Sequence, residues 1–330
     1  MAFRLLSIML VISTGAFAGI VDDVRGAIAQ NNFSAAESQL SSYKAQRGIS
    51  PEYLEALSWM GRAALGMQQY TQAEGYAKQT QALAVRQLKS RALDSEPHLP
   101  IALGAAIEVQ ALALAARGQK TAGIALLHHS LRMYGNTSIA ARLRKNLNLL
   151  TFVGQPAPAL KTGEYLGSPP ASFSQLKGSP WLLFFWAHWC ADCKAEAPIL
   201  ARLRSEFKSL IILAPTQRYG YAADGEDATP KTELAYINRV WQQYYEGLQG
   251  ASVPVSQENF KVYGASTTPT LVLVDGNGKI AFYHPGALPY EELRAAIQKV
   301  MEKTSLEMPP ANPALQSKSR EALLGAAPID

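Results

Sequence analysis

Residues 181–194 read Trp-Leu-Leu-Phe-Phe-Trp-Ala-His-Trp-Cys-Ala-Asp-Cys-Lys, an apolar run that ends in two cysteines. Cys190 and Cys193 are the only cysteines in the 330 residues. A structural disulfide framework needs more cysteines spread through the chain. A structural zinc site needs four ligands, which no second cysteine pair or paired histidines supply. Two thiols at this spacing can instead form a disulfide that opens and closes in the folded chain. The stretch therefore indicates thiol–disulfide exchange.

The residues around this stretch alternate between strand and helix patterns. The apolar run 181–186 is typical of a central strand buried on both faces, and 191–208 follows as a helix. We predict an α/β domain over 151–304, with a central mixed sheet flanked by helices, and a flexible tail over 305–330. We also expect strands at 210–214, 270–274 and 279–283, a hairpin turn at 275–278, and helices at 232–248 and 289–303.

The preceding residues, 19–150, are predicted to be helical. They are rich in Ala, Leu, Gln, Glu and Arg, and apolar residues recur every three or four positions. Ser50 followed by Pro51 is typical of a helix start. Pro97 and Pro100 interrupt the pattern and indicate a loop near the middle of the segment.

A degenerate repeat is visible within this helical segment. Phe33-x-x-Ala36 resembles Tyr70-x-x-Ala73, and the spacing between units is irregular. The pattern resembles a tetratricopeptide helix pair, in which small residues allow close packing. Such arrays offer a concave surface to a partner protein. The alternative is a bundle that packs against the second domain or mediates dimerisation, since repeats need stacked neighbours for stability.

Residues 1–18 are typical of a secretory signal peptide. Arg4 precedes a short apolar stretch, and Ala16-Phe17-Ala18 is a small-x-small cleavage site. An uncleaved N-terminal anchor is the alternative. We expect no later segment to be long and apolar enough to cross a membrane. The prediction is an exported, soluble protein after cleavage, periplasmic if the source is a Gram-negative bacterium.

Composition limits the other classes of function. Hydrophobic content of 48% and charged content of 17% are typical of an ordinary globular protein. The net charge of +5 is modest and not clustered, so we predict no nucleic-acid partner. Neither a metal nor another cofactor is expected. His128 and His129 are adjacent, so their side chains diverge on a helix and cannot chelate one ion. We expect one to be buried and the other exposed.

A buried strand, then Trp-Cys-x-x-Cys-Lys, then a helix resembles the thioredoxin arrangement. The stronger resemblance, over residues 152–303, is to the TlpA/ResA family of exported thiol–disulfide oxidoreductases. It depends on ordered matches to that family's entry motif, following strand and turn, active-site strand and loop, and cis-proline loop. These are Val-Gly-Gln-Pro-Ala-Pro at 153–158, Phe-x-x-Leu-Lys-Gly at 173–178, residues 185–193 with Glu196 and Pro198, and Tyr-Gly-Ala-Ser-Thr-Thr-Pro-Thr at 263–270.

The chemistry expected of this site follows from the residues and the resemblance together. Cys190 at a helix N-terminus is the expected nucleophile, because the helix dipole favours the thiolate. Cys193, one turn inward, would resolve the mixed disulfide. The resemblance implies that Glu196 tunes the thiols and shuttles a proton to or from Cys193. It also implies that Pro269 is cis and that Thr268 presents its backbone to a substrate strand.

Several positions near the cysteines bear on the direction of electron flow. Thioredoxin itself carries a buried aspartate where this chain has Phe184, so Glu196 is the remaining candidate for a proton relay. Asp192 should oppose a nearby thiolate, raise the pKa of that thiol and make the couple less oxidising, which predicts a reductant. His188 and Lys194 would act in the opposite direction if they lie close. Trp189 is predicted to pack beside the nucleophile, and core packing is the alternative role for this ring.

The predicted function is reduction of disulfides in other proteins, with electrons from a membrane thiol donor as the resemblance implies. The helical domain would select or hold the client protein. Alternatives are a partner-binding scaffold, a disulfide isomerase, and a Cu(I)-handling protein that uses the cysteines with Glu196 or His188. The loop over residues 219–230 carries several acidic residues and is a candidate gate for the site.

Overall fold

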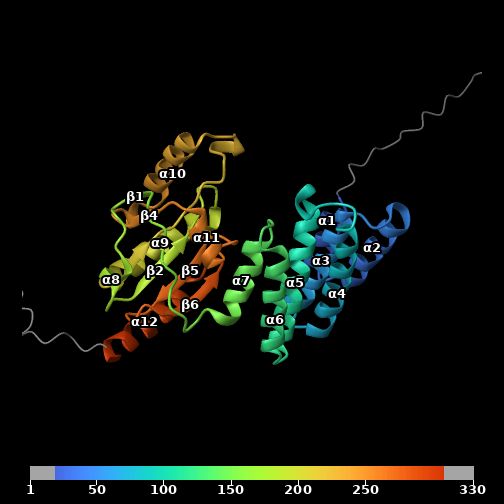
Figure 1. The fold of residues 1–330 in the computed structure, drawn as a ribbon, viewed down its shortest axis with the longest axis horizontal. Coiled ribbons are helices and arrows are strands. Elements are labelled where there is room, and N and C mark those ends of the chain that lie inside the picture. The colour runs from blue at the N-terminus through green and yellow to red at the C-terminus, as the bar shows by residue number, and fades with distance from the viewer. Residues whose placement is uncertain (1–18, 308–330) are drawn as a thin grey trace, which may run out of the picture. The chain divides into compact units, whose positions relative to one another are not determined.

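The computed structural model describes residues 19–307, apart from the side chains of Phe173 and Ser174. The predicted signal peptide and the part of the predicted tail from residue 308 onward lie outside the described residues. The chain divides, between Ala113 and Leu114, into two compact units (Figure 1). Packing thus groups residues 114–151 with the α/β part, whereas the change in sequence pattern predicts a boundary at residue 150.

The first unit is helical. Ser50 caps α3 by accepting a hydrogen bond from the amide of Tyr53 at 3.1 Å, and Pro51 occupies the first turn, as predicted. Helix α3 packs against α4, and α1 packs against α2 and α3. The tetratricopeptide resemblance of this segment stays a prediction. The helices are α1 (Ile20–Ala29), α2 (Phe33–Arg47), α3 (Pro51–Gly66), α4 (Tyr70–Gln87) and α5 (His98–Ala116), with a short 3-10 turn at Leu93–Ser95.

Helix α5 corrects two expectations. Pro100 lies in its first turn, where a missing amide proton costs nothing, and so it does not mark a loop. By length and composition α5 could also cross a membrane, contrary to the prediction for this part of the chain. Most of its apolar span is buried in the protein, however, and a core helix passes the same test.

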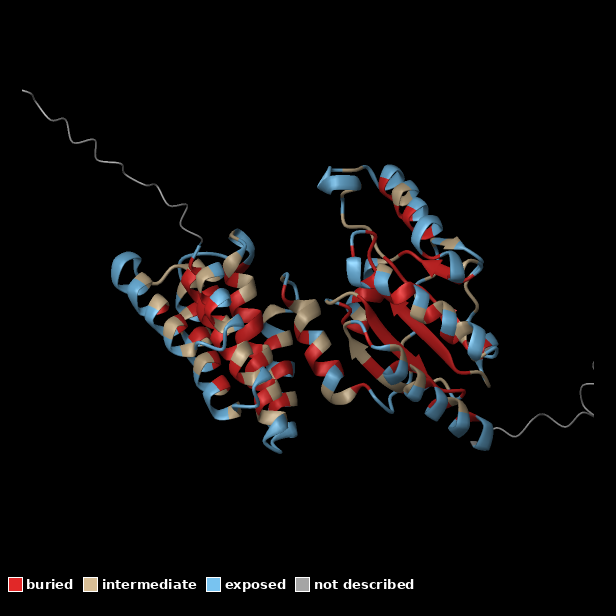
Figure 2. Ribbon diagram, turned by 180° about the vertical axis from the view of Figure 1, so that it is seen from behind, coloured by how far each residue is buried: buried red, intermediate tan, exposed pale blue. Residues whose placement is uncertain are grey.

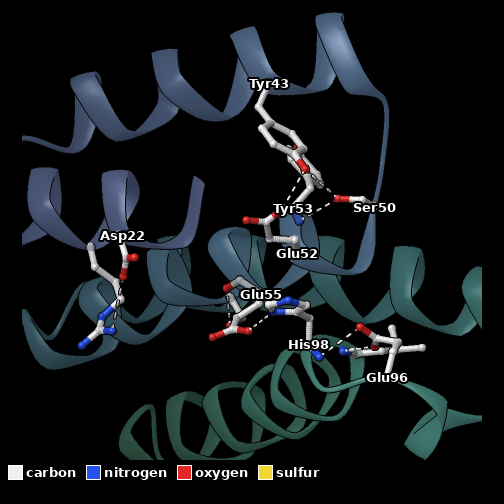
Figure 3. A network of polar contacts seen from close by, with 11 residues as sticks. Asp22, Tyr43, Ser50, Glu52, Tyr53, Glu55, Glu96 and His98 are labelled. Carbon is white, nitrogen blue, oxygen red and sulfur yellow. Dashed lines mark hydrogen bonds and ion pairs between the residues drawn. The ribbon is translucent and has the colours of Figure 1, made fainter. Parts of the chain in front are cut away.

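A network of polar contacts holds the start of α5 to α3 (Figure 3). The carboxylate of Glu96 accepts hydrogen bonds from the amides of His98, at 3.0 Å, and Leu99. The ring of His98 contacts the carboxylate of Glu55 at 2.7 Å. These contacts satisfy amides that an α-helix leaves without partners in its first turn.

The second unit contains a mixed sheet whose strand order, within the described residues, is β1-β4-β3-β2-β5-β6. Strand β2 pairs parallel with β3 and antiparallel with β5. Every residue of β2 and β5 is buried, which confirms the predicted central strand. The strands are β1 (Tyr165–Gly167), β2 (Trp181–Phe185), β3 (Ile211–Leu213), β4 (Ser252–Pro254), β5 (Thr270–Val274) and β6 (Ile280–Pro285).

Helices cover both faces of the sheet. The prediction of a strand at 173–176 is wrong, whereas the predicted turn follows at Lys177 and Gly178. Residues 173–176 form a helix because Ser172 and Gln175 make a reciprocal capping box. Helix α12 continues four residues beyond its predicted end at Lys303, to Glu307. The helices are α6 (Lys120–Tyr134), α7 (Ala140–Thr151), α8 (Phe173–Leu176), α9 (Ala191–Glu206), α10 (Pro230–Tyr244), α11 (Gln257–Tyr263) and α12 (Tyr290–Glu307), with 3-10 turns at Ala223–Gly225 and Glu246–Leu248.

Alternate side chains of β2 enter two separate cores, as the two-residue period of a strand requires. Leu182 and Phe184 join apolar side chains of α9, α10 and α12 on one face of the sheet. Phe185 lies on the other face, where it packs against Phe260 and Tyr263 of α11. Figure 2 shows the resulting band of buried residues along the strands.

Helix α7 is docked directly onto this α/β unit. The side-chain amide of Asn148 donates a hydrogen bond to the carbonyl oxygen of Tyr263 at 2.9 Å. Phe152, just after α7, packs edge-on against Tyr263 and Tyr283. Gly264, with a φ of +63°, approaches α7 so closely that a Cβ atom there would lie 2.6 Å from the backbone nitrogen of Lys145. The contact therefore requires a glycine.

Substitution Gly264→Ala should destabilise the protein beyond the cost of its backbone conformation, because the new methyl group would overlap the backbone of α7. The matched control is Gly118→Ala, which has a φ of +81° and no atom within 4 Å of the added Cβ. We expect the free energy of unfolding to fall by about 1–3 kcal/mol more for Gly264→Ala than for the control. Urea unfolding of both variants measures this difference, and equal losses would mean that α7 does not rest on Gly264.

Candidate active site

Cys190 and Cys193 form a disulfide at the point where β2 gives way to α9. Cys190 is the N-cap of α9, and its sulfur accepts a hydrogen bond from the amide of Cys193 at 3.0 Å. The sulfur–sulfur distance is 2.12 Å and the two Cα atoms are 5.3 Å apart. Both residues are buried, with 3% and 0% of their surface exposed. An amide that already points at the Cys190 sulfur would stabilise the thiolate once the disulfide is reduced.

The loop before β5 carries the cis-proline that the family resemblance implies. The peptide bond between Thr268 and Pro269 is cis. The carbonyl oxygen of Pro269 accepts a hydrogen bond from the amide of Gly286 at 2.8 Å, which ties the loop to the end of β6. The hydroxyl oxygen of Thr268 is buried without a hydrogen-bond partner in the described part of the chain. Thr268 lines the same cleft as Trp189, the residue that precedes Cys190.

Glu196 lies one helical turn after Cys193 and is also buried, with 2% of its surface exposed. One carboxylate oxygen accepts a hydrogen bond from the amide of Leu288 at 3.2 Å, and the other has no partner among residues 19–307. Burial raises the pKa of Glu196 to about 7, and the Leu288 amide opposes this shift only in part. This carboxyl group can therefore gain or lose a proton near neutral pH.

Trp189, Asp192 and Lys194 are the immediate neighbours of the two cysteines in the sequence. Asp192 is exposed, and half of the Trp189 surface is exposed as well. The Trp189 ring packs edge-on against Tyr219, so it is a surface aromatic rather than a core residue. The ammonium group of Lys194 lies over the ring of Tyr244, 4.5 Å from its centre.

His188, two residues before Cys190, forms a buried pair with Glu233. Sequence reasoning missed Glu233. Each residue has 1% of its side chain exposed, and the imidazole Nε2 is 3.4 Å from a carboxylate oxygen. The Glu233 carboxylate accepts hydrogen bonds from the amides of Tyr219 and, at 3.0 Å, Gly220. Burial lowers the pKa of His188, and the facing carboxylate opposes that shift. A glutamate in the first turn of α10 carries no local signal that would have marked it.

The loop after β3 packs two aromatic rings against His188 of this pair. Tyr219 and Tyr221 pack edge-on against His188, as does Tyr236 of α10. Arg218 fixes the base of the loop through two hydrogen bonds to Glu164, one of them 2.6 Å long. The Arg218 guanidinium also lowers the pKa of Glu164. The acidic residues that suggested a gate are exposed at the loop tip; they are Asp224, Glu226 and Asp227.

The described residues include no group of three or more His, Cys, Asp or Glu side chains arranged to hold a metal ion. His188 faces Glu233, and Glu196 accepts its hydrogen bond from a backbone amide, so the copper alternative gains no support from these two side chains. His128 and His129 are both exposed, which corrects the expectation that one is buried. The buried side of α6 falls at other positions of the helical turn.

Comparison with known proteins gives consistent matches. The sequence model of the thioredoxin-like domain family matches residues 174–301. The chain is 28% identical over 165 residues to the thiol:disulfide interchange protein DsbE of Xylella fastidiosa, over 49% of this chain and 76% of the relative. It is 30% identical over 156 residues to the protein of the same name from Tatumella citrea, over 46% of this chain and 76% of the relative. A solved structure, the thioredoxin domain of a thiol-disulfide oxidoreductase from Bacteroides vulgatus, is 21% identical with a TM-score of 0.33, over 44% of this chain and 96% of that domain.

Substitution Glu196→Gln should change how stability depends on pH. The pKa of Glu196 rises from its ordinary 4.5 to about 7 in the folded protein. The folded state therefore holds a proton that the unfolded chain releases between these values. The free energy of unfolding should fall as the pH rises through this interval. The glutamine variant stays neutral and lacks this component, so its stability relative to the wild type should increase with pH.

Urea unfolding of the oxidised proteins at a series of pH values from 4 to 8 measures this difference. Glu291→Gln, the same change at an exposed position of α12, is the control against which the pH dependence for Glu196→Gln is compared. A pH-independent difference for Glu196→Gln would mean that Glu196 has an ordinary pKa.

Proposed function

The chain belongs to the TlpA/ResA-like family of thioredoxin-fold thiol–disulfide oxidoreductases, and on this premise we propose that it is exported and reduces selected disulfides in other proteins. The observation that carries the proposal is the Cys190–Cys193 disulfide at the N-terminus of α9, next to Trp189, which lines one cleft together with Thr268 of the cis-proline loop. The helix amides favour a thiolate at Cys190, and a substrate segment in this cleft would lie against the residue that precedes the nucleophile.

The reaction begins from the reduced protein. The Cys190 thiolate attacks one sulfur of the substrate disulfide, which forms a mixed disulfide and releases the other substrate sulfur as a thiolate that takes up a proton. Cys193, deprotonated, then attacks the Cys190 sulfur and releases the second substrate thiol. The substrate gains two electrons, and the protein ends with the Cys190–Cys193 disulfide. The structure corresponds to this oxidised product.

Glu196 is the proposed acceptor for the proton of Cys193. Cys193 is fully buried, so water does not reach its thiol easily, and Glu196 is the carboxylate one turn along the same helix. A carboxyl group with a pKa near 7 is ionised for part of the time at neutral pH and can also return the proton. Pro269 and the backbone of Thr268 are proposed to pair with the substrate segment, and Trp189 to contact it.

Asp192 supports the reducing direction. It stands between the two cysteines, exposed, in the first turn of α9. A carboxylate there opposes a thiolate on either cysteine and so destabilises the reduced, ionised form. Electrons would come from a membrane thiol donor, and the first helical unit would hold or select the client protein. Export to the periplasm would place the reaction among oxidised substrates.

Substitution Cys190→Ser should abolish reduction of insulin disulfides, because the attacking sulfur is lost. Substitution Cys193→Ser should instead arrest the reaction at the mixed disulfide, since the resolving sulfur is lost. Insulin turbidity in the presence of dithiothreitol measures the first effect. Non-reducing mass spectrometry after incubation with a disulfide peptide detects the trapped adduct. Undiminished activity of Cys190→Ser would refute the assignment.

The reduction potential of the Cys190–Cys193 couple should lie near or below about −250 mV, in the range of thioredoxin. Equilibration with dithiothreitol, followed by tryptophan fluorescence, measures it. Asp192→His should raise the potential, because an imidazole opposes the thiolate less than a carboxylate does. Glu291→His, at an exposed position of α12, serves as the control and should leave the reduction potential unchanged. A wild-type value of about −120 to −180 mV would indicate that the protein forms or shuffles disulfides instead.

A further inference from the structure

The cleft beside the disulfide has a wall that the family match does not include. The cleft has a volume of about 730 Å³, which falls within the range of about 300–1,000 Å³ typical of ligand sites. Its lining includes Trp189, Tyr219 and the cis-proline loop. The lining also includes the end of α6, the α6–α7 turn and the first half of α7. These helical residues precede the match to the thioredoxin-like domain family, which begins at residue 174.

This helical wall is held in place before any substrate arrives. Asn148 and Gly264 fix α7 to α11, as described above. The α6–α7 turn is closed by its own hydrogen bonds: the hydroxyl group of Thr137 donates to the carbonyl oxygen of Tyr134 at 2.8 Å, and the amide of Ala140 donates to that of Thr137 at 3.1 Å. A preformed wall lowers the entropy that an incoming chain segment must overcome.

The charges that line the cleft have one sign. Arg144 of α7 and Lys261 of α11 are its charged lining residues, both are exposed, and the part of the chain that the structure describes contributes no Asp or Glu to the lining. The rest of the lining mixes aromatic rings such as Trp189 with hydroxyl and amide groups. The unpartnered Thr268 hydroxyl oxygen is among them. Aromatic rings and hydrogen-bonding groups suit an extended peptide, and the two cations favour carboxylates on it.

We propose that this cleft binds an extended segment of the client protein next to its disulfide, and that Arg144 and Lys261 select segments with Asp or Glu beside the cysteine. The inference rests on the proposed function, because it names the class of substrate for the same disulfide. It assigns the α6–α7 segment a role in substrate selection, with Arg144 and Lys261 as specificity-determining residues that line the cleft. The cysteines carry out the exchange, whereas Arg144 and Lys261 influence which client protein reaches the cysteines.

The test compares two synthetic disulfide peptides that differ only in whether Glu or Lys flanks the cysteines. We expect wild-type kcat/KM to be higher for the Glu peptide and the preference to weaken as salt is added. Arg144→Glu and Lys261→Glu should each reduce the preference, by up to about fivefold, the size of one exposed ion pair. The matched control is Lys299→Glu, an equal charge change at an exposed position of α12, which should leave the preference unchanged.

Two further measurements separate the inference from the proposed function. Reduction of hydroxyethyl disulfide, a small neutral substrate, tests the function alone, and failure there overturns the proposed reductase activity. Calorimetric titration of the oxidised protein with versions of the two peptides that carry Ser in place of Cys tests the cleft alone. Tighter binding of the Glu peptide, lost in Arg144→Glu or Lys261→Glu, supports the inference. Equal binding of both peptides, or a preference that survives both substitutions, overturns it.

Discussion

Strand β2 is buried on both faces along its whole length, and the position of the disulfide depends on this burial. Two apolar layers hold the strand, so the chain leaves the sheet at a fixed point. The indole of Trp186 donates a hydrogen bond to the carbonyl oxygen of Ala214, and the hydroxyl group of Thr216 donates to that of Trp186, both at 2.9 Å. A short loop then reaches Cys190 at the start of α9. The sheet therefore sets the position of the Cys190 sulfur. The amides at the start of the helix would stabilise its thiolate once the disulfide is reduced.

Two buried carboxylates near this point have different surroundings and different proposed uses. Glu196 has one amide donor and a pKa raised to about 7, which suits proton exchange with a buried thiol. Glu233 has two amide donors and faces His188, so its hydrogen bonds hold the loop that carries Tyr219. Because Tyr219 packs against Trp189, this second carboxylate shapes the wall of the cleft.

Packing extends the α/β unit beyond the segment that matches the thioredoxin-like domain family. Helix α7 contacts α11 through a buried side-chain amide and through a glycine that leaves no room for a side chain. The helical segment thus contributes a wall to the cleft as well as a separate unit earlier in the chain. In this arrangement the same helices that precede the oxidoreductase domain can contribute to its choice of substrate.

The sequence by itself determined the features that depend on neighbouring residues. The apolar run of β2 and the cysteine pair at the start of α9 were predicted from the residues, because periodicity and short motifs report local structure. The cis bond between Thr268 and Pro269 was implied by the family resemblance. Strands β1 and β4, of three residues each, are too short to show a period. The family resemblance implied a strand at 173–176, whereas the capping box of Ser172 and Gln175 starts a helix there.

Only the tertiary structure decided which distant residues meet. The pairing of His188 with Glu233 and the contact of α7 with Gly264 join segments far apart in the sequence. The placement of Arg144 and Lys261 in the lining of one cleft does so as well. No local pattern encodes these contacts, because each depends on how whole helices pack against the sheet. The chemistry of the cysteines was therefore readable from the sequence, whereas the electrostatic surroundings of the site and the shape of its cleft came from packing.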